Sequence, residues 1–374
     1  MTESLTEVRL SLVGAVADCD PFDCEPIGAD AWVISSLLQK SIRRGESEIA
    51  QRAALTFLKL KGSAIWRRLM VIAFEDVGVG SIDAVTAVVA ASSDASVRKA
   101  CGGNERIAVY LAGLMAKAAK DRSADHLAGA KDHPAQRAFA EGVAKLPVQA
   151  KLGIVGDKSL ELSKRAIAAV LTVWQGDRTW GREGTNCLLE VFRGLGVPEV
   201  LVTVTEIAAN RTREPITLIL PLIWLAAQES ERGVRDCAIP PLVMAGEVPL
   251  YALDEHTRLG REAIWRFARE NDGVRACLER FVPAAQMRRA AFVTAFYVDA
   301  APVARRFIWD QADDLEVFGR ERDLMRFGVA KEGIAPLVDV MRANLEHLNA
   351  LRAEVLTKSH PAGASLPGSL RFGR

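Results

Sequence analysis

The chain has 374 residues, of which 49% are hydrophobic and 25% are charged, so it has enough apolar surface to bury a large core. These proportions exclude a disordered or fibrous protein. With 48 Lys and Arg residues against 47 Asp and Glu residues, the net charge is +1, which excludes DNA binding driven by overall positive charge. Any contact with DNA must therefore use a local basic patch.

No segment is typical of an exported or membrane protein. Residues 1–10 lack the apolar run of a signal peptide. The most apolar stretch, residues 217–227, contains Pro221 and has about half the length that a membrane-spanning helix needs. We therefore expect a cytoplasmic protein that does not bind membranes.

The sequence contains no motif that predicts a cofactor. The cysteines and histidines lack the spacing of a metal site, and neither HExxH nor GxSxG is present. Residues 153–159 superficially resemble a nucleotide loop, but they lack the glycine spacing of a P-loop. We expect neither a metal nor another cofactor.

Hydrophobic residues recur every three or four positions through most of the chain, which predicts an all-α protein built as a multi-helix bundle. The first clear helix extends from Asp30, as N-cap, through Arg44, and Gly45 provides a left-handed stop. A second is predicted at Ser47–Leu60, and Ser63 begins a third that ends near Gly78. Further helices are expected at residues 82–91, 104–120, 134–146, 158–174, 258–270, 274–281, 284–298, 301–315 and 334–356.

The helices are expected to fall into two parts. We predict a helical domain over residues 1–155, a second helical region over residues 156–357 and a flexible tail over residues 358–374, which is rich in Pro, Gly and Ser. The segments 176–184 and 238–253 are expected to be irregular because Gly, Trp or Pro residues gather there. Tryptophans that fall in helical patterns are expected in the core, namely Trp32, Trp66, Trp224, Trp265 and Trp309.

A first cluster of charged residues lies within residues 67–78. Arg67 and Arg68 point about 100° apart on a helix, so at most one of them can lie fully on the buried face. Glu75 and Asp76 close this helix at its negative end, where acids are unfavourable unless a cation meets them. We expect an arginine from elsewhere in the chain to be that cation. The structural interpretation is an arginine–carboxylate lattice between helices or subunits, and a direct functional role is the alternative.

Several of these residues form a pattern that resembles a known family. Residues 34–45, with Lys40 and Arg43, are followed by Arg-Arg-Leu at 67–69 and Glu-Asp-Val-Gly at 75–78. This order resembles the C-terminal helical region of the replication-associated recombination protein A family, which consists of AAA+ ATPases related to clamp loaders. Residues 104–112, including Glu105, resemble the next helix of that region. The resemblance covers roughly residues 30–125.

The resemblance implies a clamp-loader-collar-like domain in residues 1–155. It implies a non-enzymatic accessory protein of DNA replication, recombination or repair, which forms homo-oligomers and binds DNA, a replication or repair protein, or an ATPase of that family. Residues 1–29 contain neither a Walker A nor a Walker B motif, so ATP hydrolysis is not implied. Assembly roles would fall to Glu75, Asp76, Gly78 and Glu105, and DNA or anion contacts to Lys40, Arg43, Arg44, Arg67 and Arg68. An alternative is a protein that mimics the ATPase's oligomerisation region and redirects its assembly.

A second cluster lies at residues 254–261, outside the resemblance. Arg258 and Arg261 share a helix face, so together they could bind a phosphate or a carboxylate. His256, if Asp254 orients it, could act as an acid or a base. This cluster predicts the alternative function, an enzyme that acts on a phosphorylated or nucleic acid substrate. The structural alternative is a helix cap, in which Asp254 or Thr257 accepts backbone N–H groups.

Overall fold

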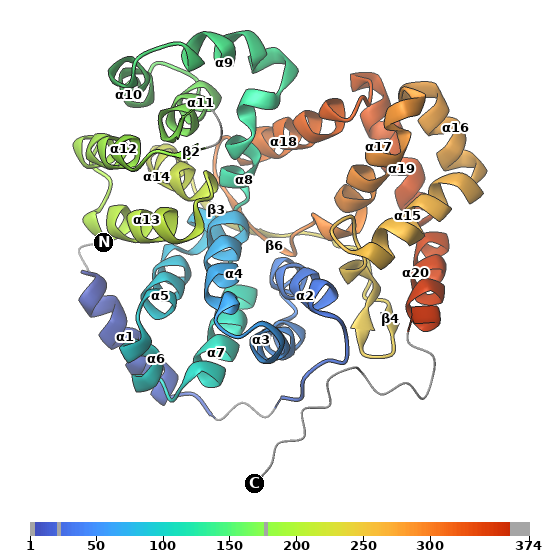
Figure 1. Ribbon diagram of the computed structural model, residues 1–374, viewed down its shortest axis with the longest axis horizontal. Helices are drawn as coiled ribbons and strands as arrows, with labels where there is room; N and C mark the ends of the chain where they lie inside the picture. The colour runs from blue at the N-terminus through green and yellow to red at the C-terminus, as the bar shows by residue number, and fades with distance from the viewer. Residues whose placement is uncertain (1–3, 21–23, 176–178, 360–374) are drawn as a thin grey trace.

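The computed structural model describes residues 4–20, 24–175 and 179–359, and it confirms the predicted all-α fold. Figure 1 shows helices α1–α14 on one side of the molecule and most of α15–α20 on the other. We call these groups the N-terminal lobe and the C-terminal lobe. No helix within the described ranges is long and apolar enough to cross a bilayer.

The N-terminal lobe contains fourteen helices in the described part of the chain. The first seven are α1 (Leu5–Ala17), α2 (Ala31–Arg44), α3 (Ser47–Lys61), α4 (Ala64–Ile72), α5 (Ile82–Ser93), α6 (Ala95–Ala100) and α7 (Asn104–Lys117). The others are α8 (Ser123–Ala128), α9 (Arg137–Ala144), α10 (Val148–Gly156), α11 (Leu162–Val173), α12 (Arg182–Gly194), α13 (Glu199–Thr212) and α14 (Ile216–Gln228).

The C-terminal lobe follows after a short stretch of strand and irregular chain. Its helices are α15 (Arg258–Glu270), α16 (Asp272–Phe281), α17 (Met287–Ala295), α18 (Ala312–Arg326), α19 (Ile334–Ala343) and α20 (Leu345–Ser359). The described strands form three antiparallel pairs, made by β1 (Trp174–Gln175) with β2 (Thr179–Trp180), β3 (Gly233–Asp236) with β6 (Arg305–Ile308), and β4 (Met244–Ala245) with β5 (Val248–Pro249).

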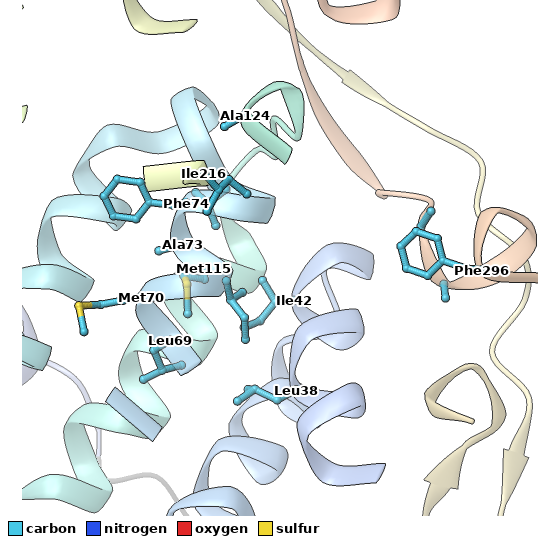
Figure 2. Packing of buried hydrophobic residues seen from close by; sticks show 14 of the residues in the cluster. Leu38, Ile42, Leu69, Met70, Ala73, Phe74, Met115, Ala124, Ile216 and Phe296 are labelled. Carbon is cyan, nitrogen blue, oxygen red and sulfur yellow. The ribbon is translucent and has the colours of Figure 1, made fainter. Parts of the chain in front are cut away.

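The helix that carries most of the site begins and ends where its sequence predicts. Asp30 accepts hydrogen bonds from the backbone N–H groups of Trp32 and Val33, at 2.8 and 3.1 Å, and so caps α2. Gly45 ends the helix with φ at 73°, a conformation that a residue with a Cβ rarely adopts. The inward face of α2 packs on α3 and α7, and Figure 2 shows Leu38 and Ile42 among the buried side chains of this lobe.

Two helices change to a π-turn at their C-terminal ends. The π-turn η1 (Ala73–Val77) continues α4, and the π-turn η7 (Phe296–Ala300) continues α17. A π-turn widens the helix and is often found at functional sites. After η1, Gly78 has φ at 51°, and a Cβ there would lie 2.5 Å from the carbonyl oxygen of Asp121, so only glycine fits this position. In Figure 2 the side chain of Phe296, on η7, lies apart from the packed residues of the N-terminal lobe.

A two-stranded ribbon joins the lobes. β3 and β6 pair with Gly233 opposite Ile308 and Asp236 opposite Arg305. The backbone of Lys120, in the N-terminal lobe, bonds to β6 through Arg305 and Phe307, at 2.9 Å each. The predicted helix at residues 301–315 is therefore wrong in its first half, because these distant partners hold residues 305–308 extended, and α18 begins only at Ala312.

Other predictions agree with the structure to different degrees. The predicted helix at residues 258–270 matches α15, whereas the one at residues 334–356 is divided at Asn344 into α19 and α20. The division near residue 155 stays a prediction; α10 and α11, on its two sides, pack against each other. The predicted tail lies outside the described residues, apart from Lys358 and Ser359 in α20.

Candidate functional site

A charged cavity lies where the two lobes meet, and residues of both predicted clusters line it. Its volume is about 420 Å³. The first cluster contributes Arg68 and Glu75, the second contributes Glu255 and His256, and α2 contributes Lys40 and Arg43. The remaining lining residues are Trp32, Ser35, Ser36, Gln39, Arg122, Asp125, Val293, Phe296, Asp323 and Phe327. A cavity of this size is typical of small-molecule sites.

One face of α2 forms a wall of this pocket. The lining residues of α2 recur at intervals of three, four, seven and eight positions, which is the spacing that places side chains on one helix face; they are Trp32, Ser35, Ser36, Gln39, Lys40 and Arg43. Polar residues therefore replace the apolar ones on the side of α2 that faces the C-terminal lobe.

At the base of the pocket, the fully buried carboxylate of Asp76 is surrounded by donors. Arg43 contacts it through Nε, Arg122 approaches to 3.2 Å, and Gln39 donates a hydrogen bond of 2.8 Å. Arg43 also bonds to Glu75 at 2.8 Å and to the carbonyl oxygen of Ala300 at 3.0 Å. The expected arginine partner of Glu75 and Asp76 is thus Arg43, supported by Arg122. These contacts connect α2, η1, η7 and the start of α8.

A second buried ion pair fixes the loop that carries the second cluster. The ammonium group of Lys40 lies 2.6 Å from Asp254, and both side chains are only 1% exposed. Although burial by itself would raise it, the charge of Lys40 holds the pKa of Asp254 below its ordinary value. Ser36 donates to Asp254 as well, and to the carbonyl oxygen of Ala252 at 2.7 Å. The positive charge of Lys40 is therefore balanced by the carboxylate of Asp254.

Arg68 differs from the other cations of the pocket. Its Nη2 donates to the carbonyl oxygen of Ser35 at 3.1 Å and to Gln39 at 2.7 Å, both of which are neutral acceptors. Its Nε is buried without a hydrogen-bond partner, and no carboxylate of the described residues lies within ion-pair distance. Arg68 is half-buried, and burial lowers its pKa, although the charges of Glu75, Asp76 and Asp254 oppose this without forming a direct ion pair. An anionic ligand would supply the direct ion pair that Arg68 lacks.

Two glutamates of the pocket have pKa values suited to proton transfer near neutral pH. Burial, and then the charges of Asp254 and Asp323, raises the pKa of Glu255 to about 7. Burial, and then the charge of Asp76, also raises the pKa of Glu75, although Arg43 and Arg122 oppose this. Arg43 forms an ion pair with Glu75, whereas the group within ion-pair distance of Glu255 among the described residues is Nε2 of His256, at 3.8 Å. Glu255 is therefore the freer acid.

His256 stands at the mouth of the pocket, with its side chain 65% exposed. Its Nε2 lies 4.0 Å from Asp254, and its ring meets Phe296 edge-on at 6.2 Å between centroids. Loss of water on its inner side, and then the charges of Lys40 and Arg43, lowers the pKa of His256 against the opposing effect of Asp254. The pKa of His256 falls to about 4, so the imidazole is neutral at pH 7 and acts there as a weak base.

The structure contains the predicted helix cap. Thr257 accepts the backbone N–H of Gly260 at 3.0 Å and caps α15, and Asp254 accepts the N–H of His256 at 3.0 Å. Arg258 and Arg261, on α15, are exposed outside the pocket lining.

The other predicted site residues lie outside the pocket. Arg44 is buried and pairs with Glu46 at 2.8 Å. Arg67 is half exposed and pairs with Glu214 at 2.8 Å, and Glu105 is exposed in the first turn of α7. The predicted basic residues of α2 and α4 thus form no continuous basic surface, because most are buried and paired.

Some lining residues were not predicted, and one expectation is wrong. Trp32 was expected in the core and is 74% exposed, because it lies on the pocket face of α2; Trp66 and Trp309 are buried as predicted. Arg122, Asp125, Phe296 and Asp323 enter the site from distant parts of the chain, and no spacing in the sequence connects them with α2. The only available signal was the unusual number of polar residues on one face of α2.

No group of His, Cys, Asp or Glu side chains that could hold a metal ion occurs in the part of the chain that the structure describes. No protein-family model, curated protein or solved structure matches this chain.

The buried pair Lys40–Asp254 should stabilise the fold through strong coupling. Lys40→Met and Asp254→Asn should each cost about 3–5 kcal/mol, because each leaves an unpaired charge, and the double variant should cost clearly less than their sum. Urea unfolding of the four proteins measures this coupling. The exposed pair Lys158–Glu229, at 2.9 Å, is the matched control, with a coupling of about 0–1 kcal/mol. Equal coupling in the two pairs would contradict this interpretation.

The raised pKa of Glu255 should make stability depend on pH. The folded state holds a proton on Glu255 up to about pH 7, whereas the unfolded chain releases it near its ordinary value, so this stabilisation is complete at low pH and is lost as pH rises through 7. Relative to Glu255→Gln, the wild type should lose on the order of 1–3 kcal/mol between pH 4 and pH 8, measured by urea unfolding. Glu105→Gln, on the surface, is the control; parallel curves for the wild type and Glu255→Gln would refute the assignment.

Proposed function

We propose that this protein is an enzyme that binds a small phosphorylated substrate in the pocket between the lobes and acts on it by acid–base catalysis. The observation that carries this proposal is the position of Arg68, a guanidinium without a counter-ion, in the same cavity as Glu255 and His256. A cation that needs an anion and two groups that can exchange protons are together what such a reaction requires.

Arg68 is the best candidate for the phosphate contact because the other lining cations are already neutralised. Lys40 is paired with Asp254, and Arg43 and Arg122 are paired with carboxylates at the base of the pocket. Arg68 offers planar N–H donors, which suit the oxygen atoms of a phosphate. The lining has four cationic side chains, Arg68 included, and four carboxyl groups, of which Glu75 and Glu255 have pKa values raised to about 7. We therefore expect a ligand anion to bind at Arg68, which makes no direct ion pair with a described residue.

Glu255 and His256 have complementary protonation states near pH 7. Glu255 is partly protonated there and can donate a proton, and the neutral His256 can accept one. With Glu255 as general acid and His256 as general base, a proton leaves the substrate at His256 and another enters it from Glu255. Asp254 holds the backbone N–H of His256 and so positions this residue.

Substitution of two adjacent arginines tests the binding step. Arg68→Met should weaken the binding of inorganic phosphate and of sugar phosphates at least about tenfold, because it removes the unpaired cation. Arg67→Met, which alters an exposed arginine outside the pocket, should leave binding unchanged within about twofold. Isothermal titration calorimetry measures both. Equal effects of the two substitutions, or no phosphate binding by the wild type at millimolar concentration, would reject the proposal.

The catalytic step is tested with a mixture of phosphorylated sugars and nucleotides, followed by phosphorus and proton NMR. The wild type should convert one component, and Glu255→Gln should slow the conversion by about 10²–10⁴-fold while the substrate still binds. Glu105→Gln should retain full activity. Binding without any conversion by the wild type would reduce the pocket to a receptor site and reject the enzymatic part of the proposal.

A second candidate function is the accessory role in DNA replication, recombination or repair that the sequence resemblance implies. One surface favours it. Several exposed arginines of α15–α17 have no carboxylate of the described residues within ion-pair distance, and four of them lie over aromatic rings, namely Arg269 over Trp265, Arg280 over Phe281, Arg288 over Phe292 and Arg289 over Phe327. Phe292 is buried and the other three rings are half-buried, so the arginines and not the rings are available to a ligand. A group of exposed arginines without ion pairs is typical of a surface that binds nucleic acid phosphates.

Binding to a labelled single-stranded oligonucleotide at low salt tests this second candidate. The double variant Arg258→Glu/Arg261→Glu should weaken binding at least about tenfold and reduce its salt dependence, whereas Arg68→Met should have no effect. Fluorescence anisotropy measures the affinity, and light scattering measures assembly. A monomer that binds no oligonucleotide at 50 mM salt would exclude this role.

A further inference from the structure

One large aromatic side chain that lines the pocket, Trp32, is mostly exposed instead of packed in the core. Trp32 is 74% exposed, although its backbone is fixed by the hydrogen bond from its N–H to Asp30 at 2.8 Å. An exposed indole costs free energy that burial would recover. Trp32 also lines the same cavity as Arg68. Its position is therefore defined, and its ring is available to a ligand.

The C-terminal lobe contributes three apolar side chains to the lining, Val293, Phe296 and Phe327, beside the polar Glu255, His256 and Asp323. Phe296 is held in place by Arg43 and Arg122, whose guanidinium groups lie 5.3 and 5.6 Å from its ring centroid. A flat ring that enters the mouth would thus contact Trp32 and would find apolar groups within the cavity.

The distance between Trp32 and the anion-binding group can be estimated from α2. Arg68 donates to Ser35 and Gln39, which lie three and seven residues after Trp32 on the same helix face. At 1.5 Å per residue, these positions are roughly 5–10 Å further along the helix axis. A ligand that reaches both therefore carries a flat ring and an anionic group separated by about this span.

From this juxtaposition we infer that the substrate is a nucleoside monophosphate, with its base stacked on Trp32 and its phosphate on Arg68. The inference rests on the proposed function and adds the class of substrate to it. Every nucleobase has a flat face on which an indole can stack, whatever the base. The cavity of about 420 Å³ has room for one nucleotide.

The test compares AMP with ribose 5-phosphate, which has the phosphate and the sugar but no base. Wild type should bind AMP at least about tenfold more tightly than ribose 5-phosphate. Trp32→Ala should reduce the affinity for AMP to within about twofold of that for ribose 5-phosphate, and Trp32→Phe should retain most of it. Because Trp32 is exposed, these variants should fold, which circular dichroism checks. Trp265→Ala, which removes an indole outside the pocket, is the control and should bind AMP normally.

The outcomes separate this inference from the function on which it rests. If inorganic phosphate and ribose 5-phosphate bind through Arg68 but AMP binds no more tightly, the assignment of a nucleotide is overturned and the phosphate site stands. If none of the three binds, the proposed function fails as well. A single-stranded decamer that displaces AMP from the wild type and not from Trp32→Ala would also support a nucleotide site, and would assign it to a strand end instead of a free nucleotide.

Discussion

The structure around the pocket depends on the buried carboxylate of Asp76. A lone buried charge would cost several kcal/mol, so the chain must bring cations and donors to it. Arg43, Arg122 and Gln39 meet this requirement, and each comes from a different part of the N-terminal lobe or a different turn of α2. Since Arg43 also bonds to the carbonyl oxygen of Ala300, the same charge network holds η7 of the C-terminal lobe against α2.

This network leaves most charged side chains of the pocket paired within the protein. The cations at its base are paired with carboxylates, and Lys40 is paired with Asp254, so Arg68 is the lining cation without a direct ion pair to a described residue. Glu255 and His256 lie on the loop before α15, which the buried pair Lys40–Asp254 anchors to α2.

Local signals in the sequence were sufficient for parts of the fold. The cap at Asp30 and the stop at Gly45 determine α2, and the helical period predicted α15 to the residue. These local signals could not predict contacts between distant parts of the chain. Residues 305–308 form a strand because β3 and Lys120 pair with them. The two predicted clusters form one site only because α2 and the loop at Asp254 meet in space. The prediction for Trp32 failed for the same reason. Periodicity places Trp32 on one face of α2, but it does not show whether that face packs against the core or lines a cavity.

The two π-turns occur in similar surroundings. Each follows a nine-residue helix, α4 or α17, that begins within four residues of an arginine pair, and each ends near a buried aspartate that meets an arginine: Asp76 with Arg43, and Asp299 with Arg352. Both lobes thus place a buried aspartate–arginine contact beside a widened helix end that lines the cavity, with Glu75 on one lobe and Phe296 on the other. A substitution that straightened either helix end would therefore disturb a buried ion pair and the cavity wall together.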